Sequence, residues 1–298
     1  MKDAVALVQH ATLGRAASDF LALTKPRLNL LVVATSGAGY YLGAPGRPEL
    51  AAMIETIVGT ALVAGGSAAL NQVYERETDA LMSRTRLRPL PAGRVSLLDA
   101  TVFGLALSGA GLLLLALFAN LLAFALAAVT LLVYVGIYTP MKRLSPAATY
   151  VGAIPGALPP VIGWVASHGT IGVGGVALFA IVLLWQIPHF MAIAWICRDD
   201  YGKAGFPMLP IIEPSGRRAA RQALVYALAL VPVSVVPTLA GTAGVMYAVL
   251  ALPLGAALAW FAIRFAATRS DPDARRLFFG SIVYLPLLWV FMIWFKHS

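Results

Sequence analysis

Oxygen-bearing side chains recur every four residues near the end of the second apolar segment of the chain. Asn71, Glu75 and Asp79 would share one face if a helix continues through them, because each step of four adds only about 40° of rotation. Their oxygens would then form a stripe about 12 Å long. Amide and carboxylate oxygens are hard ligands of the kind that Mg²⁺ prefers. The spacing therefore predicts a magnesium site, with Asn71, Glu75 and Asp79 as metal ligands and catalytic residues.

Basic residues lie on both sides of this stripe in the sequence. Arg84 and Arg88 follow it, while Lys25 and Arg27 precede the first apolar segment. Guanidinium and ammonium groups bind phosphate, so these four residues are predicted to bind a magnesium-bound diphosphate. The alternative is a solvated loop in which the arginines only neutralise the acidic residues. We favour the functional interpretation because a carboxylate costs roughly 2.5–3.5 kcal/mol near the bilayer centre, so a chain that keeps one beside an apolar run is expected to use it.

A second polar cluster follows the sixth apolar segment. Asp199 and Asp200 are adjacent there, so on a helix they diverge by about 100° and cannot both face one ion equally. One of the two is expected to meet Mg²⁺ or a water bound to the diphosphate, while the other pairs with Arg198 or Lys203. We assign the metal-binding and catalytic role to Asp200, and substrate-binding roles to Asp199 and Lys203.

Lys142 and His189 are further candidates. Lys142 follows Pro140, which is expected to end the fourth span and to direct the lysine over the opening of the site. An ordinary cytoplasmic anchor is the alternative, but this loop shares a face with both acidic clusters, so we favour a catalytic role. His189 lies deep in the sixth span, where it is either a buried, hydrogen-bonded residue or a substrate ligand. We count it among the candidate substrate-binding residues.

These residues belong to a chain with the composition of a membrane protein. Hydrophobic residues make up 60% of its 298 residues and charged residues only 12%, against about 45–50% and 25% in soluble domains. The single cysteine excludes an internal disulfide. Nine segments could span a bilayer, and the fifth, rich in proline and glycine, is expected to be kinked or broken. The predicted spans are residues 28–44, 51–70, 97–117, 119–137, 149–166, 171–194, 223–241, 244–264 and 277–295.

The positive charges alternate across these spans. If all nine cross, 20 of the 22 Lys and Arg residues lie on one side, which the positive-inside rule assigns to the cytoplasm. The N-terminus and the long loops would then be cytoplasmic and the C-terminus outside, in the inner membrane of a bacterial cell. Residues 1–23 are predicted to form a cytoplasmic arm, and residues 24–298 a single transmembrane domain. This topology accounts for the net charge of +9, so no nucleic-acid partner is expected.

The chain resembles the UbiA superfamily of intramembrane prenyltransferases from residue 23 to the last predicted span. The first acidic motif of the superfamily matches Asn71, Glu75 and Asp79, although most members carry Asp where Glu75 stands. Its Tyr-x-x-x-Lys element matches Tyr138 and Lys142, which adds Tyr138 to the candidate substrate-binding residues. The resemblance implies an all-α membrane protein, a bundle of nine transmembrane helices whose active site faces the cytoplasm.

Other motifs are similar to those of the heme-modifying branch of this superfamily. They are residues 84–90, 186–190 and 200–210. The last of them brings Tyr201 into the candidate substrate site. The second superfamily motif, Asp-x-x-x-Asp, would place carboxylates at Cys197 and Tyr201, and neither residue is acidic. Asp199 or Asp200 would have to supply the second carboxylate instead. This replacement of the motif is similar to the pattern of the heme-modifying branch.

This resemblance implies transfer of the farnesyl group of farnesyl diphosphate to a vinyl group of heme b, with addition of water, giving heme O and diphosphate. It also implies Mg²⁺ as cofactor, surrounding membrane lipid, and a heme A synthase as downstream partner. Two alternatives remain. One is a prenyltransferase for an aromatic acceptor such as 4-hydroxybenzoate, and the other is a transporter of an anionic amphiphile. A transporter needs access from both sides, whereas every candidate polar group here lies on the predicted cytoplasmic side.

Overall fold

Long apolar helices form nearly all of the structure, a computed structural model that describes residues 15–297. Within that range, eight helical segments are long and apolar enough to cross a membrane, so the chain is a multi-pass integral membrane protein. The first of the nine predicted spans is also helical, as α2 (Pro26–Gly43). It is not one of the eight, because polar and small residues interrupt its apolar run. All nine predicted segments are therefore helical, and eight have the hydropathy of a spanning helix.

Most helices begin and end within a few residues of the predicted spans, but α3 continues eleven residues beyond position 70, and α12 and α15 each begin six residues earlier than predicted. In chain order they are α2 (Pro26–Gly43), α3 (Leu50–Leu81), α4 (Leu97–Phe118), α5 (Leu121–Leu131), η1 (Leu132–Tyr138), α6 (Thr139–Met141), α7 (Ala148–Ala157), α8 (Pro159–His168), α9 (Gly172–Ile196), α10 (Arg198–Lys203), α11 (Leu209–Ile212), α12 (Arg217–Val233), α13 (Val236–Leu239), α14 (Val245–Thr268) and α15 (Asp271–Trp294).

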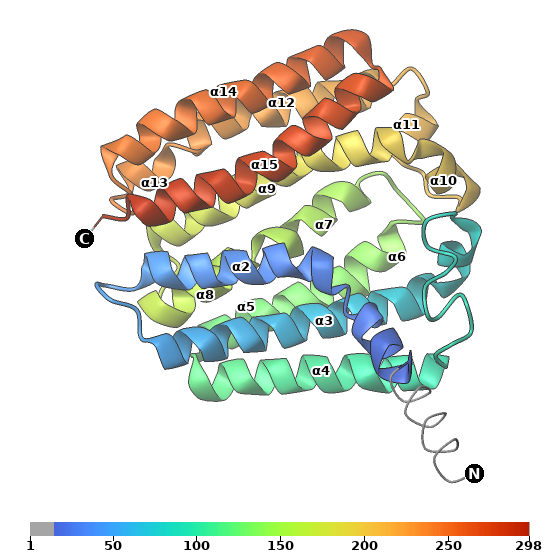
Figure 1. Cartoon of the computed structure of the whole chain (residues 1–298), viewed down its shortest axis with the longest axis horizontal. Helices are drawn as coiled ribbons and strands as arrows, with labels where there is room; N and C mark the ends of the chain where they lie inside the picture. The colour runs from blue at the N-terminus through green and yellow to red at the C-terminus, as the bar shows by residue number, and fades with distance from the viewer. Residues whose placement is uncertain (1–14, 298) are drawn as a thin grey trace, which may run out of the picture.

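The bundle consists of two groups of helices. α9, α12, α14 and α15 pack against one another in the upper part of Figure 1, while α2, α3, α4, α5 and α8 pack together in the lower part. Contacts of α7 and α8 with α9 join the two groups. The α3–α4 loop and the short helix α10 lie beside each other at one end of the bundle (Figure 1). The two polar clusters found in the sequence are therefore at the same end.

Two spans depart from a continuous α-helix. The fifth predicted span is broken between α7 and α8, where Pro159 cannot donate a backbone hydrogen bond, which confirms the expected break. The fourth span passes from α5 through a π-helical turn, η1, into α6. The hydroxyl of Thr139 donates to the carbonyl of Tyr134 at 2.7 Å in this turn. Pro140 lies inside α6, which ends at Met141, one residue beyond the proline and four residues beyond the predicted span.

Small residues bring α2 and α8 into direct backbone contact. A Cβ atom built on Gly163 would lie 1.8 Å from the carbonyl oxygen of Ser36, and one on Gly39 would lie 2.0 Å from the carbonyl oxygen of Pro160. Only glycine fits at either position. Such close approach of backbones is a common way for helices to associate in lipid, where burial of apolar surface gives little driving force.

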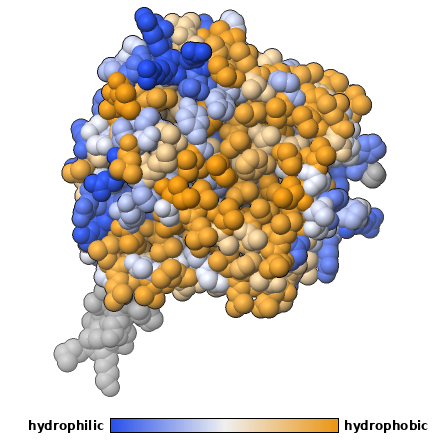
Figure 2. Space-filling view, turned by 180° about the vertical axis from the view of Figure 1, so that it is seen from behind, coloured by the Kyte–Doolittle hydropathy of each residue, from blue (hydrophilic) through white to orange (hydrophobic). Residues whose placement is uncertain are grey.

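The outer surface of the bundle is apolar. Large hydrophobic side chains such as Leu98, Leu121 and Val245 are exposed. Figure 2 shows hydrophobic residues across the centre of one face, with hydrophilic residues gathered towards its edges. An apolar surface of this extent is unfavourable in water and is expected of a surface that faces lipid.

The described part of the predicted N-terminal arm is a helix over residues 15–23 that packs on α3 and α4. Asp19 pairs with Arg94 at 3.0 Å, and the rings of Phe20 and Phe103 lie 5.1 Å apart. Leu23 is fully buried. Residues 1–14 of the predicted arm lie outside the described residues.

Gly163→Val is expected to disrupt the packing of α2 on α8. Overpacked interiors typically cost about 1–3 kcal/mol, and contact with a rigid backbone should reach at least the upper end of that range. Thermal denaturation of the purified chain in detergent measures the loss. Gly109→Ala is the matched control, because nothing lies within 4 Å of a Cβ at Gly109. Equal Tm values for the two variants would contradict this account of the contact.

Candidate functional site

The stripe of oxygen-bearing residues lies on one unbroken helix. α3 runs from Leu50 to Leu81 without interruption, so Asn71, Glu75 and Asp79 share a face, as their spacing predicts. All three are buried, with side chains almost inaccessible to solvent. Buried carboxylates are stable only when they are paired. Their partners therefore determine what the stripe can bind.

Two lysines from other elements meet the first half of the stripe. Lys25, which immediately precedes α2, donates its Nζ hydrogen bond to Asn71 Oδ1 at 2.8 Å. Lys142, which follows α6, donates to Glu75 Oε1 at 2.8 Å. The amide of Asn71 donates in turn to the hydroxyl of Thr139 at 3.1 Å, which directs Oδ1 towards Lys25. No sequence pattern singles out Thr139, because its role depends on this contact between α3 and α6.

The far end of the stripe carries an unpaired oxygen. Arg88 Nη1 donates to Asp79 Oδ2 at 2.7 Å, and the hydroxyl of Thr85 donates to the backbone carbonyl of Asp79. Asp79 Oδ1 is buried and has no hydrogen-bond partner among residues 15–297. An unsatisfied buried carboxylate oxygen is rare, and it marks a position where a ligand or metal ion would be stabilising.

The oxygen ligands of the stripe suit a hard cation that takes its remaining ligands from a bound substrate. Within the described residues, no three His, Cys, Asp or Glu side chains come together as a metal site. The stripe offers the amide oxygen of Asn71 and the carboxylates of Glu75 and Asp79, which suit Mg²⁺ but leave several of its positions for other oxygen ligands. Mg²⁺ is usually held in this way, by a few carboxylates together with substrate phosphates.

Positive charge exceeds negative charge around the stripe. Three cationic residues, Lys25, Arg88 and Lys142, face two carboxylates, Glu75 and Asp79. Burial, with a smaller contribution from the neighbouring Arg88, lowers the pKa of the Lys25 ammonium to about 7. An anion bound beside Lys25 would favour its charged form. The site is therefore suited to an anionic ligand.

The second cluster ties α10 to the α3–α4 loop. Ser83 Oγ donates to Asp200 Oδ1 at 2.5 Å, and Arg84 Nη2 donates to the hydroxyl of Tyr201 at 3.0 Å. Lys203 lies 3.8 Å from Asp200. The hydrogen bond from Ser83 holds the pKa of the Asp200 carboxyl below its ordinary value. Asp200 is thus the inward-facing member of the acidic pair, and Ser83 is a partner that the sequence analysis did not identify.

Other predicted residues lie away from these contacts. Asp199 and Arg27 are exposed, and no described hydrogen bond joins either to the stripe. Arg198 does not pair with either neighbouring aspartate but with Asp271, at 2.9 Å. The indole of Trp195 also donates to Asp271, and Trp195 does not line the cavity described next. The tryptophan instead helps to attach α9 to α15.

A largely apolar cavity of about 360 Å³ opens beside the stripe. Lys25 and Tyr138 line it near the stripe, and His189 and Phe190 line it on α9. The Nζ atom of Lys142 lies 4.8 Å from the centre of the Tyr138 ring. Most of the remaining lining is aliphatic and comes from α2, α3, α7, α8 and α9. Among the described lining residues, Lys25 thus supplies the formal charge, in a cavity that is otherwise suited to a hydrocarbon.

His189 is held rigidly in the cavity wall. Its Nδ1 atom is joined to Ser281 Oγ at 2.8 Å. Its ring stacks between Trp185 and Phe278, with centroid distances of 5.0 Å on both sides. His189 is thus a buried, hydrogen-bonded residue that also lines the cavity, so both interpretations of the sequence apply to it.

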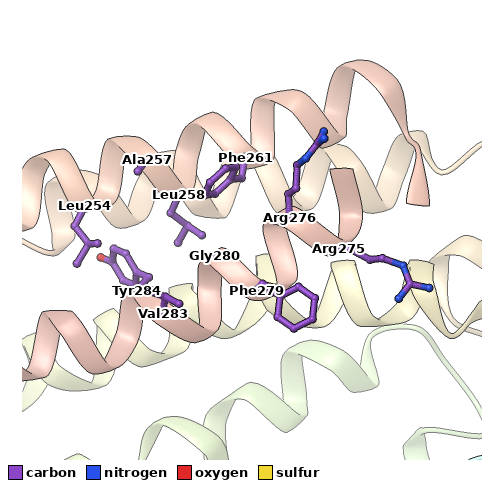
Figure 3. A pocket seen from close by; sticks show the side chains of 10 residues that line it. All are labelled: Leu254, Ala257, Leu258, Phe261, Arg275, Arg276, Phe279, Gly280, Val283 and Tyr284. Atoms are coloured by element: carbon purple, nitrogen blue, oxygen red, sulfur yellow. The ribbon is translucent and has the colours of Figure 1, made fainter. Parts of the chain in front are cut away.

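A second hollow, of about 520 Å³, lies between α14 and α15. Figure 3 shows Arg275 and Arg276 at one end of it, Tyr284 towards the other, and Phe261 and Phe279 between them. No described residue that contacts the stripe lines this hollow, whereas Lys25, which donates to Asn71, lines the cavity beside α3. The cavity beside α3 is therefore the candidate active site.

The match to known proteins agrees with this geometry. Residues 31–292 match the UbiA prenyltransferase family. The chain therefore belongs to the UbiA prenyltransferase family.

Relatives within this family are more specific. A protein of Solibacter usitatus named protoheme IX farnesyltransferase is 46% identical over 284 residues, which cover 92% of this chain and 97% of the relative. A protein of Koribacter versatilis with the same name is 43% identical over 285 residues, 92% of each chain. The chain is thus similar to protoheme IX farnesyltransferases over nearly its whole length.

The fold is also similar to solved structures. A UbiA homolog from Archaeoglobus fulgidus, bound to GPP and Mg²⁺, superposes with a TM-score of 0.65 and 16% sequence identity. The match covers 92% of this chain and 99% of that chain. At this identity the likeness shows the fold, which is the helical bundle inferred from the sequence.

Glu75→Gln is expected to lower the free energy of unfolding by about 3–5 kcal/mol, because it leaves the buried ammonium of Lys142 without its counter-charge. The double variant Glu75→Gln with Lys142→Met removes both charges and should recover most of the loss. Denaturant titration of the detergent-solubilised chain measures both. Arg94→Gln breaks the more exposed pair with Asp19 and serves as control, with an expected change of at most about 1 kcal/mol. A double variant as unstable as Glu75→Gln would contradict the pairing.

Proposed function

We propose that this protein transfers the farnesyl group of farnesyl diphosphate to a vinyl group of heme b, with addition of water, giving heme O and diphosphate. One observation carries the proposal: a stripe of three buried residues with hard oxygen ligands, each residue met by one cation, stands beside an apolar cavity. The names of the relatives support farnesyl transfer to heme within the UbiA family.

The diphosphate end of the substrate is expected at the stripe. Asn71, Glu75 and Asp79 would hold Mg²⁺, which would supply charge neutralisation to the leaving diphosphate. The A. fulgidus homolog binds GPP and Mg²⁺ together, which supports a divalent metal in this family. Lys25 and Lys142 add fixed positive charge to the phosphate oxygens, and such charge stabilises the leaving group as the allylic C–O bond breaks.

Basic and polar residues of the second cluster complete this end of the site in the proposal. Arg88 and Arg84 belong to the α3–α4 loop, which Ser83 ties to α10. Arg84 and Tyr201 would bind phosphate oxygens, together with Lys203. Asp200 is proposed as the additional acid, in place of the superfamily's second motif. Arg27 and Asp199 are exposed at this end, where they could contact a substrate head group.

The apolar cavity is proposed to hold the isoprenoid chain. Its aliphatic lining excludes water, which would otherwise capture the farnesyl cation before the acceptor does. The vinyl π-bond of heme b attacks this cation and forms the new C–C bond, and water then adds to the cation left on the acceptor and loses a proton to give the hydroxyl group. His189 is the residue proposed to meet the acceptor or to orient this water. Its contact with Ser281 occupies Nδ1 and leaves Nε2 for that role.

The proposal also includes the setting of the enzyme. The distribution of basic residues supports a cytoplasmic N-terminus, a cytoplasm-facing site and an outward C-terminus. Residues 24–298 would form one transmembrane domain in the inner membrane of a bacterium, with residues 1–23 as an arm. Heme O is the expected substrate of a heme A synthase, which would be the downstream partner.

Membranes that carry this chain are expected to convert heme b, farnesyl diphosphate and Mg²⁺ into a hydroxyethylfarnesyl heme. Asp79→Asn should lower the rate at least about 100-fold, because it removes a carboxylate that would hold the Mg²⁺ needed to neutralise the leaving diphosphate. Mass analysis of the extracted hemes measures the product. Asp99→Asn, which alters a carboxylate at the start of α4, is the control and should keep the activity. Unmodified heme from folded wild-type protein would overturn the proposal, and full activity in Asp79→Asn would remove Asp79 from its role.

Removal of divalent metal is expected to abolish product formation. The carboxylates of the stripe would then face the diphosphate directly, and like charges repel. The measurement is the same heme analysis after treatment with a chelator, followed by titration with Mg²⁺, which should restore the rate. Undiminished activity in excess chelator would contradict the metal site.

A further inference from the structure

Lys25 has an unusual backbone conformation for a residue at a binding site. Its φ and ψ angles are 49° and 55°, in the left-handed region, and Arg269 is the other non-glycine residue of the described chain with a positive φ. This region is unfavourable for a residue with a long side chain. Because Pro26 follows, an extended backbone would be the ordinary conformation at position 25. Other contacts must therefore hold Lys25 in this turn.

Two side-chain amides hold the residues just before Lys25. Gln72 Nε2 donates to the carbonyl of Leu23 at 2.7 Å, and Asn29 Nδ2 donates to the carbonyl of Thr24 at 2.6 Å. Gln72 is almost fully buried, and Leu23 is fully buried. We call Gln72 and Asn29 the amide clamp. It satisfies two consecutive carbonyls that the turn would otherwise leave unpaired.

Gln72 connects this turn to the helix that carries the stripe. It follows Asn71 directly on α3, so it points about 100° away from the stripe and is on a different face from the proposed metal ligands. Asn71 Oδ1 meets the ammonium of Lys25, while Gln72 holds the backbone two residues before that lysine. Two adjacent residues of α3 therefore position both the ammonium group of Lys25 and the backbone that leads to it.

We propose that Gln72 is a positioning residue for the phosphate site. It acts with Asn29 to hold residues 23–25 in the strained turn, so that the ammonium of Lys25 stands ready for the diphosphate. This inference rests on the proposed function, in which Lys25 binds the diphosphate. A hydrogen bond that served stability alone would link Gln72 to folding but not to phosphate binding.

The test is a double-mutant cycle on ligand binding by the intact, detergent-solubilised chain. The variants are Gln72→Met, Lys25→Met and the two combined, and the probe is inorganic pyrophosphate with Mg²⁺, titrated by calorimetry. Lys25→Met should weaken binding about tenfold or more, because it removes a charged hydrogen-bond donor. Gln72→Met should weaken binding by a similar factor. The double variant should bind no more weakly than Lys25→Met alone, because Gln72 acts only through that lysine.

Asn120→Leu is the matched control. Asn120 also uses its side-chain amide to donate to a backbone carbonyl, that of Val165 at 2.7 Å, but it begins α5 and is not part of the clamp or the stripe. This variant should lower Tm and leave pyrophosphate binding unchanged. Steady-state kinetics give a second readout: Gln72→Met should raise KM for farnesyl diphosphate by a larger factor than it lowers kcat.

Three results would overturn the inference. The first is wild-type affinity in a folded Gln72→Met variant. The second is a double variant whose loss equals the product of the two single losses. The third is unchanged binding in Lys25→Met while the chain still converts heme b, which would leave the proposed function intact. A wild-type chain that neither binds pyrophosphate nor modifies heme would overturn the proposed function and this inference with it.

Discussion

A carboxylate inside an apolar bundle is stable only where a cation or a hydrogen-bond donor meets it, and the arrangement of this molecule follows from that constraint on α3. Glu75 requires Lys142, and Asp79 requires Arg88, so the end of the fourth span and the α3–α4 loop must both approach the same helix face. Lys25 brings the start of α2 to that face as well. Segments far apart in the sequence are thus held around one helix by charge as well as by packing.

Glycine has two opposite effects on the space around that face. Between α2 and α8 it lets the backbones touch and leaves no room. In α7, a Cβ on Gly152 would meet the ring of Tyr138, and one on Gly156 would meet the amide of Gln186. These two large side chains therefore lie over glycines while they line the cavity. The same residue type closes one helix interface and gives the cavity wall its polar and aromatic groups.

The parts that sequence could predict are those set by local periodicity. The helical spans, the break near Pro159 and the shared face of Asn71 and Asp79 all follow from spacing and residue type along one segment. Successive residues on a helix differ by about 100° in direction, so the sequence predicts that Asp199 and Asp200 face different ways. Which of the two faces the α3–α4 loop depends on how α10 packs against that loop. Neutral residues such as Thr139 had no signal, because their role exists only where two distant elements meet.

The π-helical turn η1 controls the rotational phase of the fourth span. Its hydrogen bonds enclose one residue more than those of an α-helix, as where the amide of Thr139 donates to the carbonyl of Tyr134. One α-helical residue corresponds to about 100° of rotation, so the extra residue turns everything beyond it to another face. Lys142 reaches Glu75 from this turned face. A relative with one residue fewer in this stretch would keep the Tyr-x-x-x-Lys motif, but its lysine would point about 100° away from α3. The length of this short stretch therefore carries information that a comparison of residue types alone would miss.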